Sequence, residues 1–540
     1  MRSIIEAYNR IKNNKFLYIF LSLLVLLAIS LFINFYSLKV FDPDGYYHIR
    51  HAWLYRTNGI TDTSFPWVQY SVINKLGGDL WYGFHIFLIP FTYFQDFVWA
   101  IKITSVVITW VALSLYFFAV HRLKFRLPLL WPAVLPFMSY YLLARLMVTR
   151  PHPLSLGLNM LLFSFLIQGG TWPVFIIGFF LSFIHLNLAW VPVLTLLIVS
   201  IGRKINRQSL EINKALALVG GIVIGIFLKP NPIAALKLNY TQLVDIILIK
   251  MRGIRLDFGN ELKPIELSNF SFYHLPFVAA VTLFFVWLVY KRHLAKISLM
   301  SKIAMWTLLL LIMLFLGLVL FVAGRAMDFY ISYLIMLTGF CLTFSINGIA
   351  DKFRKSGLDN SLKQDVLKGG VILAALFFIV FYNIFSTNDF RSYLDGLPDP
   401  QRSERSAAWL HENTEKNEIV FHLGWDHFPE LFFWNQHNYY INGMDPIFMY
   451  KYDTKLYWEF YFLSIDQGGE YTCSHRKCTK DEAVKTYDVL IDDFNASYIL
   501  IRPSSHPNVF SYLISSPDKF EIVFINQPDV IFRIKPPKKI

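Results

Sequence analysis

The chain has 540 residues, of which 55% are hydrophobic and only 16% are charged, and its mean hydropathy is +0.45. Soluble globular domains usually carry about 25% charged residues, so this composition argues against an ordinary soluble protein and favours a membrane protein. The net charge of +13 does not indicate nucleic-acid binding, because the basic residues lie mainly in short connectors between apolar segments.

Apolar segments recur along the first 390 residues, and a helix of about 20 residues spans a bilayer. The segment 80–94 is short, aromatic and interrupted by Gly83 and Pro90, so we expect it to lie at the interface or to re-enter without crossing. We therefore expect a mainly α-helical polytopic protein with about eleven membrane spans. They are placed at 16–36, 97–120, 127–145, 153–168, 172–186, 188–202, 214–229, 274–290, 302–323, 327–346 and 369–386.

Basic residues predict the orientation of these spans, because cytoplasmic loops are enriched in Lys and Arg. If 80–94 does not cross, the basic clusters all fall on the inner side; they lie at 2–15, 122–126, 203–207, 291–296 and 352–355. The unusual polar residues then gather on the outer side. We expect a multi-pass protein of a bacterial inner (plasma) membrane, with its site facing the periplasm or the outside.

The C-terminal segment 387–540 is more polar and contains only short apolar runs. Residues 403–413 predict a helix, and 498–502 and 520–524 predict strands. We expect a small soluble α/β domain here, on the outer face. Residues 1–386 would form the transmembrane catalytic domain, with outer loops at 37–96 and 229–273.

Three cysteines are present. Cys341 lies in an apolar run, where inert packing is expected. Cys473 and Cys478 bracket four polar residues, and this spacing fits a small disulfide in an oxidising compartment or two free thiols equally well.

The exit of the first span is the most unusual segment of the chain. Asp42 and Asp44 follow it, and Pro43 and Gly45 interrupt the helix there. Carboxylates beside a membrane are costly unless water, a cation or a polar substrate shares their place. We interpret the pair as catalytic or as ligands of Mg²⁺ or Mn²⁺, which prefer oxygen; the alternative is a helix cap.

The string Asp44-Gly-Tyr-Tyr-His48-Ile-Arg50, following one transmembrane helix, resembles the first outer loop of the catalytic subunit of oligosaccharyltransferase. That enzyme is a member of the C-type (GT-C) membrane glycosyltransferases, which use polyprenyl-linked sugar donors. The resemblance implies that Asp44 binds a divalent metal and contacts the acceptor, with Asp42 as its partner. His48 and Arg50 would contact phosphate or a lipid headgroup.

Two further outer segments correspond to family motifs. The turn Arg150-Pro151-His152 stands where the family has a second acidic metal motif, but it has no aspartate. His152 remains a candidate metal ligand, and Arg150 a candidate phosphate ligand or a snorkelling interfacial side chain. In the long loop 229–273, which has no clear span, the resemblance implies that Glu261 helps to seat the acceptor, with Glu266 as the second choice and an ordinary solvated acid as the alternative.

Arg325 stands at the start of a late span, where the family places an arginine against the donor phosphate. A local pair with Asp328 is the alternative. Trp425-Asp426 corresponds to part of the family's Trp-Trp-Asp motif, which reads the acceptor; one tryptophan is missing here. A core tryptophan with a capping aspartate is the alternative.

These observations lead to one functional hypothesis. The protein would transfer a sugar or oligosaccharide from a polyprenyl-phosphate or polyprenyl-diphosphate donor to a protein, glycan or lipid acceptor at the outer membrane face. A monosaccharide transferase acting on a glycan or lipid is the nearest alternative. A lipid-linked sugar transporter or flippase is the alternative from another class. Membrane lipids are expected partners, and nucleic acid is not.

Overall fold

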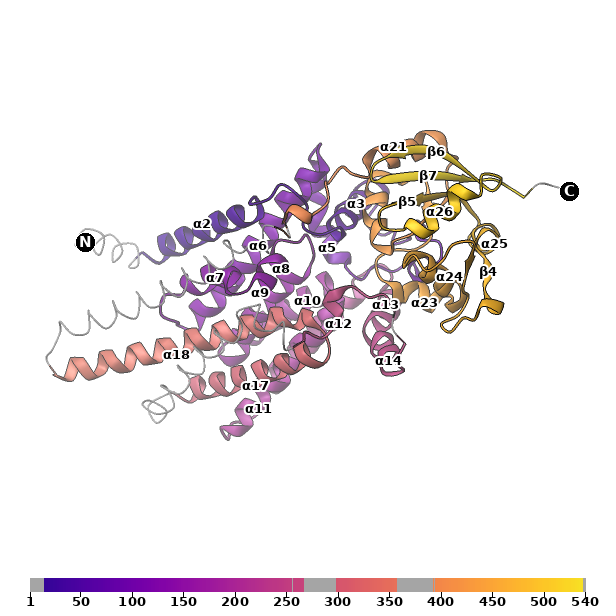
Figure 1. Cartoon of the computed structure of the whole chain (residues 1–540). Helices are drawn as coiled ribbons and strands as arrows, with labels where there is room; N and C mark the ends of the chain where they lie inside the picture. The colour runs from indigo at the N-terminus through magenta and orange to yellow at the C-terminus, as the bar shows by residue number, and fades with distance from the viewer. Residues whose placement is uncertain (1–13, 255, 267–297, 357–391, 393, 538–540) are drawn as a thin grey trace. The chain divides into compact units, whose positions relative to one another are not determined.

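The computed structural model describes residues 14–254, 256–266, 298–356, 392 and 394–537 (Figure 1). Within them the chain is mainly helical, with a small sheet in its C-terminal part, as predicted. Its packing forms two compact units. Unit 1 is drawn from 1–41, 102–226 and 259–397, and unit 2 from 42–101, 227–258 and 398–540.

This grouping places most of both outer loops, 37–96 and 229–273, in the same unit as the C-terminal segment. The predicted domain boundary between 386 and 387 stays a prediction. The packing shows that the polar segments far apart in sequence belong to one body.

Unit 1 is a bundle of helices with short connections. Its elements are α2 (Lys15–Asn34), α6 (Phe97–Arg122, whose first turns belong to unit 2), α7 (Leu130–Val134), η2 (Leu135–Met138), α8 (Tyr140–Leu146), α9 (His152–Ile167), α10 (Thr171–Ile184), η3 (Leu186–Leu188), α11 (Trp190–Ile205), α12 (Ile212–Phe227), η5 (Asn260–Leu262), α17 (Leu299–Phe321), η7 (Gly324–Ala326) and α18 (Met327–Ser356).

Six helices of the described residues are long and apolar enough to span a membrane, fewer than the eleven predicted. They are 15–34, 97–122, 186–205, 232–251, 299–321 and 324–344. Three shorter apolar helices, 152–167, 171–184 and 212–227, coincide with predicted spans. The predicted spans 274–290 and 369–386 lie outside the described residues.

The predicted span 127–145 is wrong as a single helix. The segment is broken into α7, the 3-10 turn η2 and α8. Pro132 and Pro136 explain the break, because proline has no N–H to donate and its ring clashes with the preceding turn. The last part of the segment, α8, is a short helix that carries Arg145 in its last turn and ends shortly before Arg150. Both arginines belong to the candidate site described below.

The prediction that 229–273 has no clear span is also incomplete. Residues 232–251 form one helical run made of α13 (Pro232–Tyr240), the π turn η4 (Thr241–Asp245) and α14 (Ile246–Met251). The polar residues of this helical run lower its mean hydropathy to 1.3, so the sequence alone did not indicate a span here. In unit 2 it is tied to the C-terminal segment, since Asp245 pairs with Lys451 at 3.2 Å.

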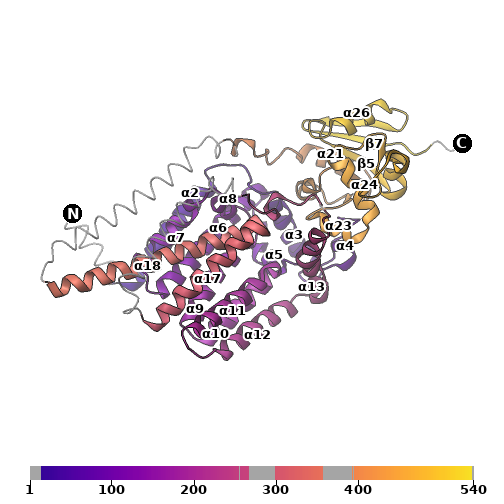
Figure 2. The same cartoon turned by 60° about the horizontal axis from the view of Figure 1, so that its bottom comes forward.

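The close approach of α10 and α12 explains why glycine recurs in α12. A Cβ at Gly221 would lie 2.1 Å from the Phe175 carbonyl oxygen, and one at Gly225 would lie 2.3 Å from Ser182 Oγ. Four-residue spacing of small side chains is a common device of membrane helices, because it lets two backbones meet. Elsewhere in the bundle, α17 and α18 run side by side (Figures 1 and 2), with Phe315 stacked on Phe329 at 5.1 Å.

Unit 2 contains the sheet and several short helices. The helices are α3 (Asp44–Asn58), α4 (Val72–Leu76), α5 (Tyr82–Leu88), η1 (Ile89–Tyr93), α13, η4, α14, α21 (Glu404–Asn413), η8 (Trp425–His427), α22 (Phe428–Trp434), α23 (Pro446–Tyr452), α24 (Thr454–Ser464), η9 (Lys480–Glu482), α25 (Thr486–Asp488), η10 (Val489–Asp493) and α26 (Pro507–Ser515). The segment 80–94 forms only α5 and η1, so it has no helix of spanning length, as predicted.

The main sheet has five strands in the order β2-β1-β5-β7-β6. They are β1 (Ile419–His422), β2 (Tyr439–Tyr440), β5 (Ala496–Ile501), β6 (Phe520–Asn526) and β7 (Asp529–Ile534). β1 pairs in parallel with β2 and β5, whereas β7 pairs antiparallel with β5 and β6. β1 and nearly all of β5 are buried, so they read as continuous apolar runs. The predicted helix at 403–413 and both predicted strands are confirmed.

The segment 42–101 docks onto this sheet. Gln69 N–H donates to the Tyr440 carbonyl at 2.8 Å, and Trp67 Nε1 donates to the Gln436 carbonyl at 2.9 Å. These bonds cap the β2 edge, which would otherwise present unpaired backbone groups. A second, two-stranded pair, β3 (Tyr471–Thr472) and β4 (Val484–Lys485), lies near a Cys473–Cys478 disulfide, which realises one of the two predicted alternatives.

Candidate functional site

The charged side chains of unit 1 gather around Glu261. Arg145 Nη1 and Arg150 Nη1 both donate to its carboxylate, the latter at 3.1 Å. Arg145 also donates through Nε to Asp328 Oδ2 at 3.1 Å. Glu261 and Asp328 therefore hold Arg145 between them, and we call Arg145, Arg150, Glu261, Asp328 and Arg325 the arginine cluster.

Local backbone geometry places these residues. Arg145 lies in the last turn of α8, and Pro151 forms the N-cap of α9 directly after Arg150. The Glu261 loop is held by the Gly324 N–H, which donates to the Lys263 carbonyl at 2.8 Å, and by the Ile265 N–H, which donates to the Val319 carbonyl at 3.0 Å. The second bond satisfies an orphan carbonyl at the end of α17, so the loop is fixed by the helix that it caps.

The charges in the cluster do not balance. Arg145, Arg150 and Arg325 outnumber Glu261 and Asp328. Burial alone would raise the pKa of Glu261, but the three arginines lower it to about 2. The carboxylate is therefore ionised at neutral pH, and the cluster keeps an excess positive charge that suits an anion such as phosphate.

His152 lies at the edge of this cluster, with Nε2 3.8 Å from Asp328 Oδ2. Its surroundings do not fit the predicted Mg²⁺ or Mn²⁺ ion. Such ions prefer oxygen ligands, and Arg145 and Arg150 would repel a dication here.

Asp42 and Asp44 belong to unit 2, at the start of α3. Asp42 Oδ1 accepts the Asp44 N–H at 3.3 Å, which ties Asp42 to the first turn of α3, although the N-cap residue of this helix is Pro43. Asp44 lies in the first turn of α3 and its charge acts on the buried Tyr47 hydroxyl. Nothing in these contacts decides whether Asp44 binds a metal, and that prediction stays open.

Further along α3, a buried chain of hydrogen bonds begins at His48. His48 Nδ1 lies 2.8 Å from His85 Nε2, and His85 Nδ1 lies 2.7 Å from Asp79 Oδ2. Asp79 also accepts from Tyr55 Oη at 2.7 Å and from the Trp81 N–H at 2.8 Å. All of these side chains except Trp81 are buried.

The protons in this series of hydrogen bonds have a definite order when both histidines are neutral. Burial alone would raise the pKa of Asp79, but His85, His51 and Lys229 lower it well below its usual range, so the group is a carboxylate. A neutral His85 donates through Nδ1 to this carboxylate and accepts at Nε2, and His48 then donates through Nδ1. The acceptor nitrogen of a neutral His48 is consequently Nε2.

His51, Asp79 and His85 also have the residue types of a metal site, and one ligand atom of each lies within 4.8 Å of the others. Two nitrogen or oxygen ligands of one tetrahedral zinc ion stand about 3.3 Å apart, given metal–ligand bonds of about 2.0 Å. The 2.7 Å contact between His85 and Asp79 is a hydrogen bond, and Lys229 adds a nearby positive charge. The geometry supports a proton-ordered network instead of a metal site.

Arg50 does not point to a phosphate site. Its guanidinium lies 5.0, 4.8 and 5.1 Å from the ring centroids of Trp53, Phe97 and Phe433. Burial lowers its pKa to about 10. This aromatic cage fastens α3 to α22, which gives Arg50 a packing role.

Trp425 and Asp426 form η8, directly before α22. Trp425 is half-buried and Asp426 is exposed, so this carboxylate is accessible to a polar ligand. α22 packs against α3, with Tyr46 and Phe433 rings 5.0 Å apart. The motif and Asp44 thus belong to adjoining elements of unit 2.

A buried ion network holds the start of α22. Arg402 donates to both Glu430 oxygens, at 2.8 Å through Nε, and Arg502 donates to Glu430 at 3.2 Å and to Asp529 at 2.9 Å. We call these four residues the sheet network. Arg402 lies just before α21, Glu430 lies in α22, Asp529 begins β7 and Arg502 follows β5. The network therefore joins these four parts of unit 2.

Sequence reasoning missed Arg145, Asp79 and His85, and treated Asp328 only as a local partner of Arg325. The signal for Arg145 and Asp328 was present, because an ionisable residue inside an apolar segment is a functional candidate by default. Asp79 and His85 carried no such signal, since they precede and lie within a short aromatic segment. No protein-family model matches this chain, and no curated protein is similar to it.

Proposed function

We propose that this protein is a membrane glycosyltransferase that moves a sugar or oligosaccharide from a polyprenyl-phosphate or polyprenyl-diphosphate donor to an acceptor at the outer face of a membrane. The observation that carries the proposal is the arginine cluster, three guanidinium groups against two carboxylates at one end of apolar helices. A lipid-linked phosphate fits this position, because guanidinium groups bind phosphate and the apolar helices can accommodate a lipid chain.

The cluster would act on the leaving group. Arg145 and Arg150 exchange part of their bonding to Glu261 for the donor phosphate, and Arg325 adds charge. The C1–O bond of the sugar breaks and its electron pair goes to the phosphate oxygen, where the arginines stabilise the charge that develops. This stabilisation grows toward the transition state, as catalysis requires.

Asp44 would act on the acceptor. Its nucleophilic oxygen or nitrogen forms the new bond to C1, and its proton passes to the Asp44 carboxylate. Asp426 and Trp425 offer an exposed carboxylate and a ring face for sugar or peptide groups, and Asp42 fixes the first turn of α3. Whether the acceptor is protein, glycan or lipid is a question for experiment.

One observation weighs against the rival transporter. A transporter places its ionisable residues near the middle of the membrane. Here Asp328 lies in the first turn of α18 and Arg145 in the last turn of α8, so the charges stand at helix ends. The Cys473–Cys478 disulfide also supports an outer position for unit 2, because disulfides persist in oxidising compartments.

The test is transfer of radiolabelled sugar from purified polyprenyl-monophosphate and polyprenyl-diphosphate donors to peptide, glycan and lipid acceptors. Asp44→Ala and Arg325→Ala should each lower turnover by about 10²–10³-fold, the usual effect of removing one such group. Asp62→Asn and Arg207→Ala, at exposed connectors, are the matched controls. Wild-type turnover in both site variants would overturn the assignment, and movement of intact donor across vesicles without bond cleavage would establish the transporter.

A further inference from the structure

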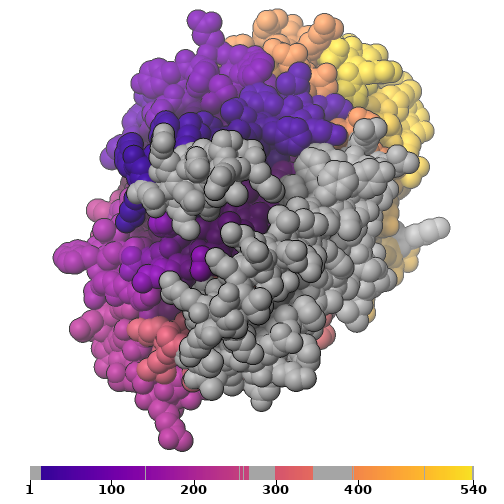
Figure 3. All heavy atoms as spheres, turned by 90° about the vertical axis from the view of Figure 1, so that its left-hand side faces the viewer, coloured from indigo at the N-terminus to yellow at the C-terminus, as the bar shows by residue number. Residues whose placement is uncertain are grey.

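A second polar feature of unit 1 lies at the other end of its helices. It is a cavity of about 980 Å³ between α2, α6, α9 and the 123–128 connector. Its lining comprises Lys15, Tyr18, Ile19, Phe118, His121, Arg122, Lys124, Phe125, Arg126, Leu127, Pro128, Leu161 and Phe165. Figure 3 views the molecule from the end at which α2 begins, where indigo and purple segments lie next to each other.

The cavity and the arginine cluster occupy opposite ends of α6. Ser105 bonds to Thr149 beside the cluster, whereas Arg122 lines the cavity. These positions are 17 residues apart, or about 25 Å along a helix at 1.5 Å per residue. The separation is close to the roughly 30 Å hydrocarbon thickness of a bilayer, so the cavity lies at the opposite membrane edge.

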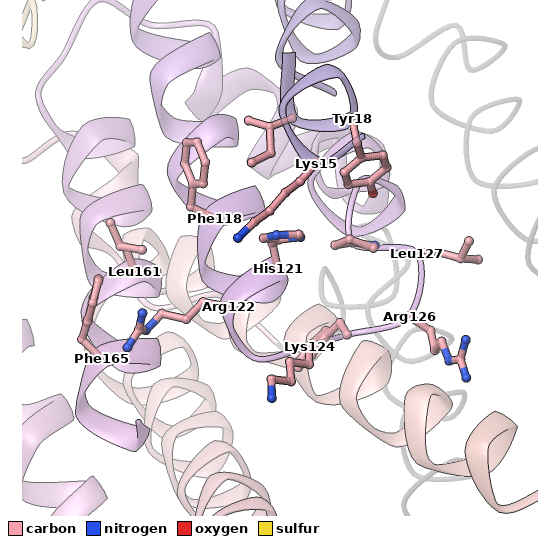
Figure 4. Close-up of a pocket in the computed structure, with 13 residues that line it drawn as sticks. Lys15, Tyr18, Phe118, His121, Arg122, Lys124, Arg126, Leu127, Leu161 and Phe165 are labelled. Atoms are coloured by element: carbon pink, nitrogen blue, oxygen red, sulfur yellow. The ribbon is translucent and has the colours of Figure 1, made fainter. Parts of the chain in front are cut away.

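Positively charged side chains gather in the wall of this cavity, as far as the described residues form it. Lys15, Arg122, Lys124 and Arg126 line it, and none of its 13 lining residues is acidic. In Figure 4 the Lys15 ammonium ends beside the His121 ring, with Arg122 and Lys124 below. Like charges brought together repel one another unless water or an anion shares the space.

Another basic connector of unit 1 shows the ordinary arrangement. Between α11 and α12, Arg203 pairs with Glu211 at 3.3 Å and Lys214 pairs with the same carboxylate at 2.6 Å. That connector supplies its own counter-ion. The connector at 123–128 has no acidic residue, so loop chemistry alone does not account for its charges.

The cavity is also shaped and fixed. Arg122 donates to the Gln168 carbonyl through Nε at 3.1 Å and lies 3.9 Å from the Phe165 ring centroid. Lys124 and Leu127 adopt left-handed backbone angles, with φ of 59° and 51°, which side-chain-bearing residues rarely take. The apolar walls are formed by Ile19, Phe118, Leu161 and Phe165, as Figure 4 shows for the last three.

We propose that this cavity binds an anionic membrane phospholipid, whose phosphate lies among Lys15, Arg122 and Lys124 and whose acyl chain follows the apolar wall at Phe118 and Leu161. Basic pockets between transmembrane helices on the cytoplasmic side are suited to such headgroups. The positive-inside pattern places this edge on that side. The proposal does not depend on the transferase activity.

The experiment uses the full chain in detergent micelles, titrated with phosphatidylglycerol, phosphatidylcholine or inorganic phosphate and followed by native mass spectrometry. The wild type should bind phosphatidylglycerol at least about tenfold more tightly than phosphatidylcholine. Lys15→Gln/Lys124→Gln should weaken phosphatidylglycerol binding roughly 30-fold, given about tenfold or less for each basic residue near an anionic headgroup. Leu161→Trp should weaken it by filling the cavity without changing charge.

The matched control is Lys204→Gln/Arg207→Gln, which removes the same charge from exposed residues of the other connector. It should change binding less than about threefold, within the usual range for exposed pairs. Equal affinity for the two lipids, or an equal loss in the control, would overturn the proposal. Displacement of the lipid by an equal concentration of inorganic phosphate would show a small-anion site and overturn it as well.

Discussion

Two clusters of arginine and carboxylate occupy this chain, one in each unit, and they differ in charge balance and exposure. The sheet network pairs two arginines with two acids; the side chains of Arg502, Glu430 and Asp529 are 6%, 4% and 0% exposed, and only that of Arg402, at its edge, reaches 25%. The arginine cluster sets three arginines against two acids. Its Arg150 and Glu261 side chains are 24% and 31% exposed.

The difference indicates what each cluster does. A charge-balanced and mostly buried network joins segments of a fold, because each charge already has an opposite partner. An open cluster with excess charge gains when an anion arrives. Residue types alone do not separate the two, since both are arginine–carboxylate clusters.

The largest expected effect is on the stability of unit 2. Glu430→Gln keeps the shape of the side chain but leaves Arg402 and Arg502 with one carboxylate between them. Losing one partner of a buried ion pair costs about 3–5 kcal/mol. We expect the free energy of unfolding to fall by that amount in a denaturant titration followed by tryptophan fluorescence. Glu412→Gln, at an exposed position of α21, should change it by less than about 0.5 kcal/mol.

Arg150→Ala should have the reverse profile. We expect sugar transfer to fall by about 10²–10³-fold, as for other groups that stabilise a developing charge, with little change in the unfolding midpoint. Turnover and thermal unfolding are measured on the same preparation. If the variant unfolds as easily as Glu430→Gln while its remaining folded fraction transfers sugar normally, the two clusters do not differ in the way argued here.

Much of the fold was predictable from the sequence. Long apolar runs predict α2, α6, α17 and α18, because only hydropathy and length are needed. β5 and β6 followed from short β-branched and aromatic runs. The helix 232–251 escaped because its polar residues serve contacts with a distant segment, such as Asp245 with Lys451, which a linear pattern does not contain.

The site was predictable only in part, because a linear pattern indicates single residues but not the contacts between distant segments. Glu261, Arg150 and Arg325 were chosen individually from the sequence. In the structure Arg150 donates to Glu261, and Arg325 lies close enough for its charge to lower the pKa of Glu261. Arg145 was overlooked because it fell at the edge of a predicted span that two prolines break. Whether Asp44 acts with them is a prediction that rests on resemblance and awaits the transfer assay.

A third cluster, around Asp79, tests whether a closed network can still bear on function. In Asp79→Asn, the new amide oxygen continues to accept the Trp81 N–H. The amide N–H₂ group therefore takes the place of Oδ2 and faces His85 Nδ1. His85 then accepts at Nδ1, and the order of protons reverses up to His48 Nδ1. If His48 serves the reaction, turnover should fall about 10- to 10²-fold.

Tyr55→Phe is the control for that change. It removes another hydrogen bond to the same carboxylate without reversing the order of protons toward His48, so turnover should fall less than about threefold. Equal losses in the two variants would mean that the network supports only the packing of α3. An unchanged rate in Asp79→Asn would mean that His48 does not serve the reaction.

The smallest expected effect is the acid dependence of the arginine cluster. The pKa of Glu261 is about 2, whereas an unfolded glutamate has a pKa of about 4.3. Since the folded-state pKa is the lower one, the stabilisation from this carboxylate is present above about pH 4.5 and is lost as the pH falls toward 2. Because Glu261 is partly exposed, we expect about 1–2 kcal/mol. Glu261→Gln should therefore be less stable than the wild type at pH 7, and the gap should close between pH 4.5 and 2.5, measured by unfolding at each pH. A gap that stays constant over that range would mean that Glu261 acts through shape and not through charge, and the cluster would then resemble the sheet network after all.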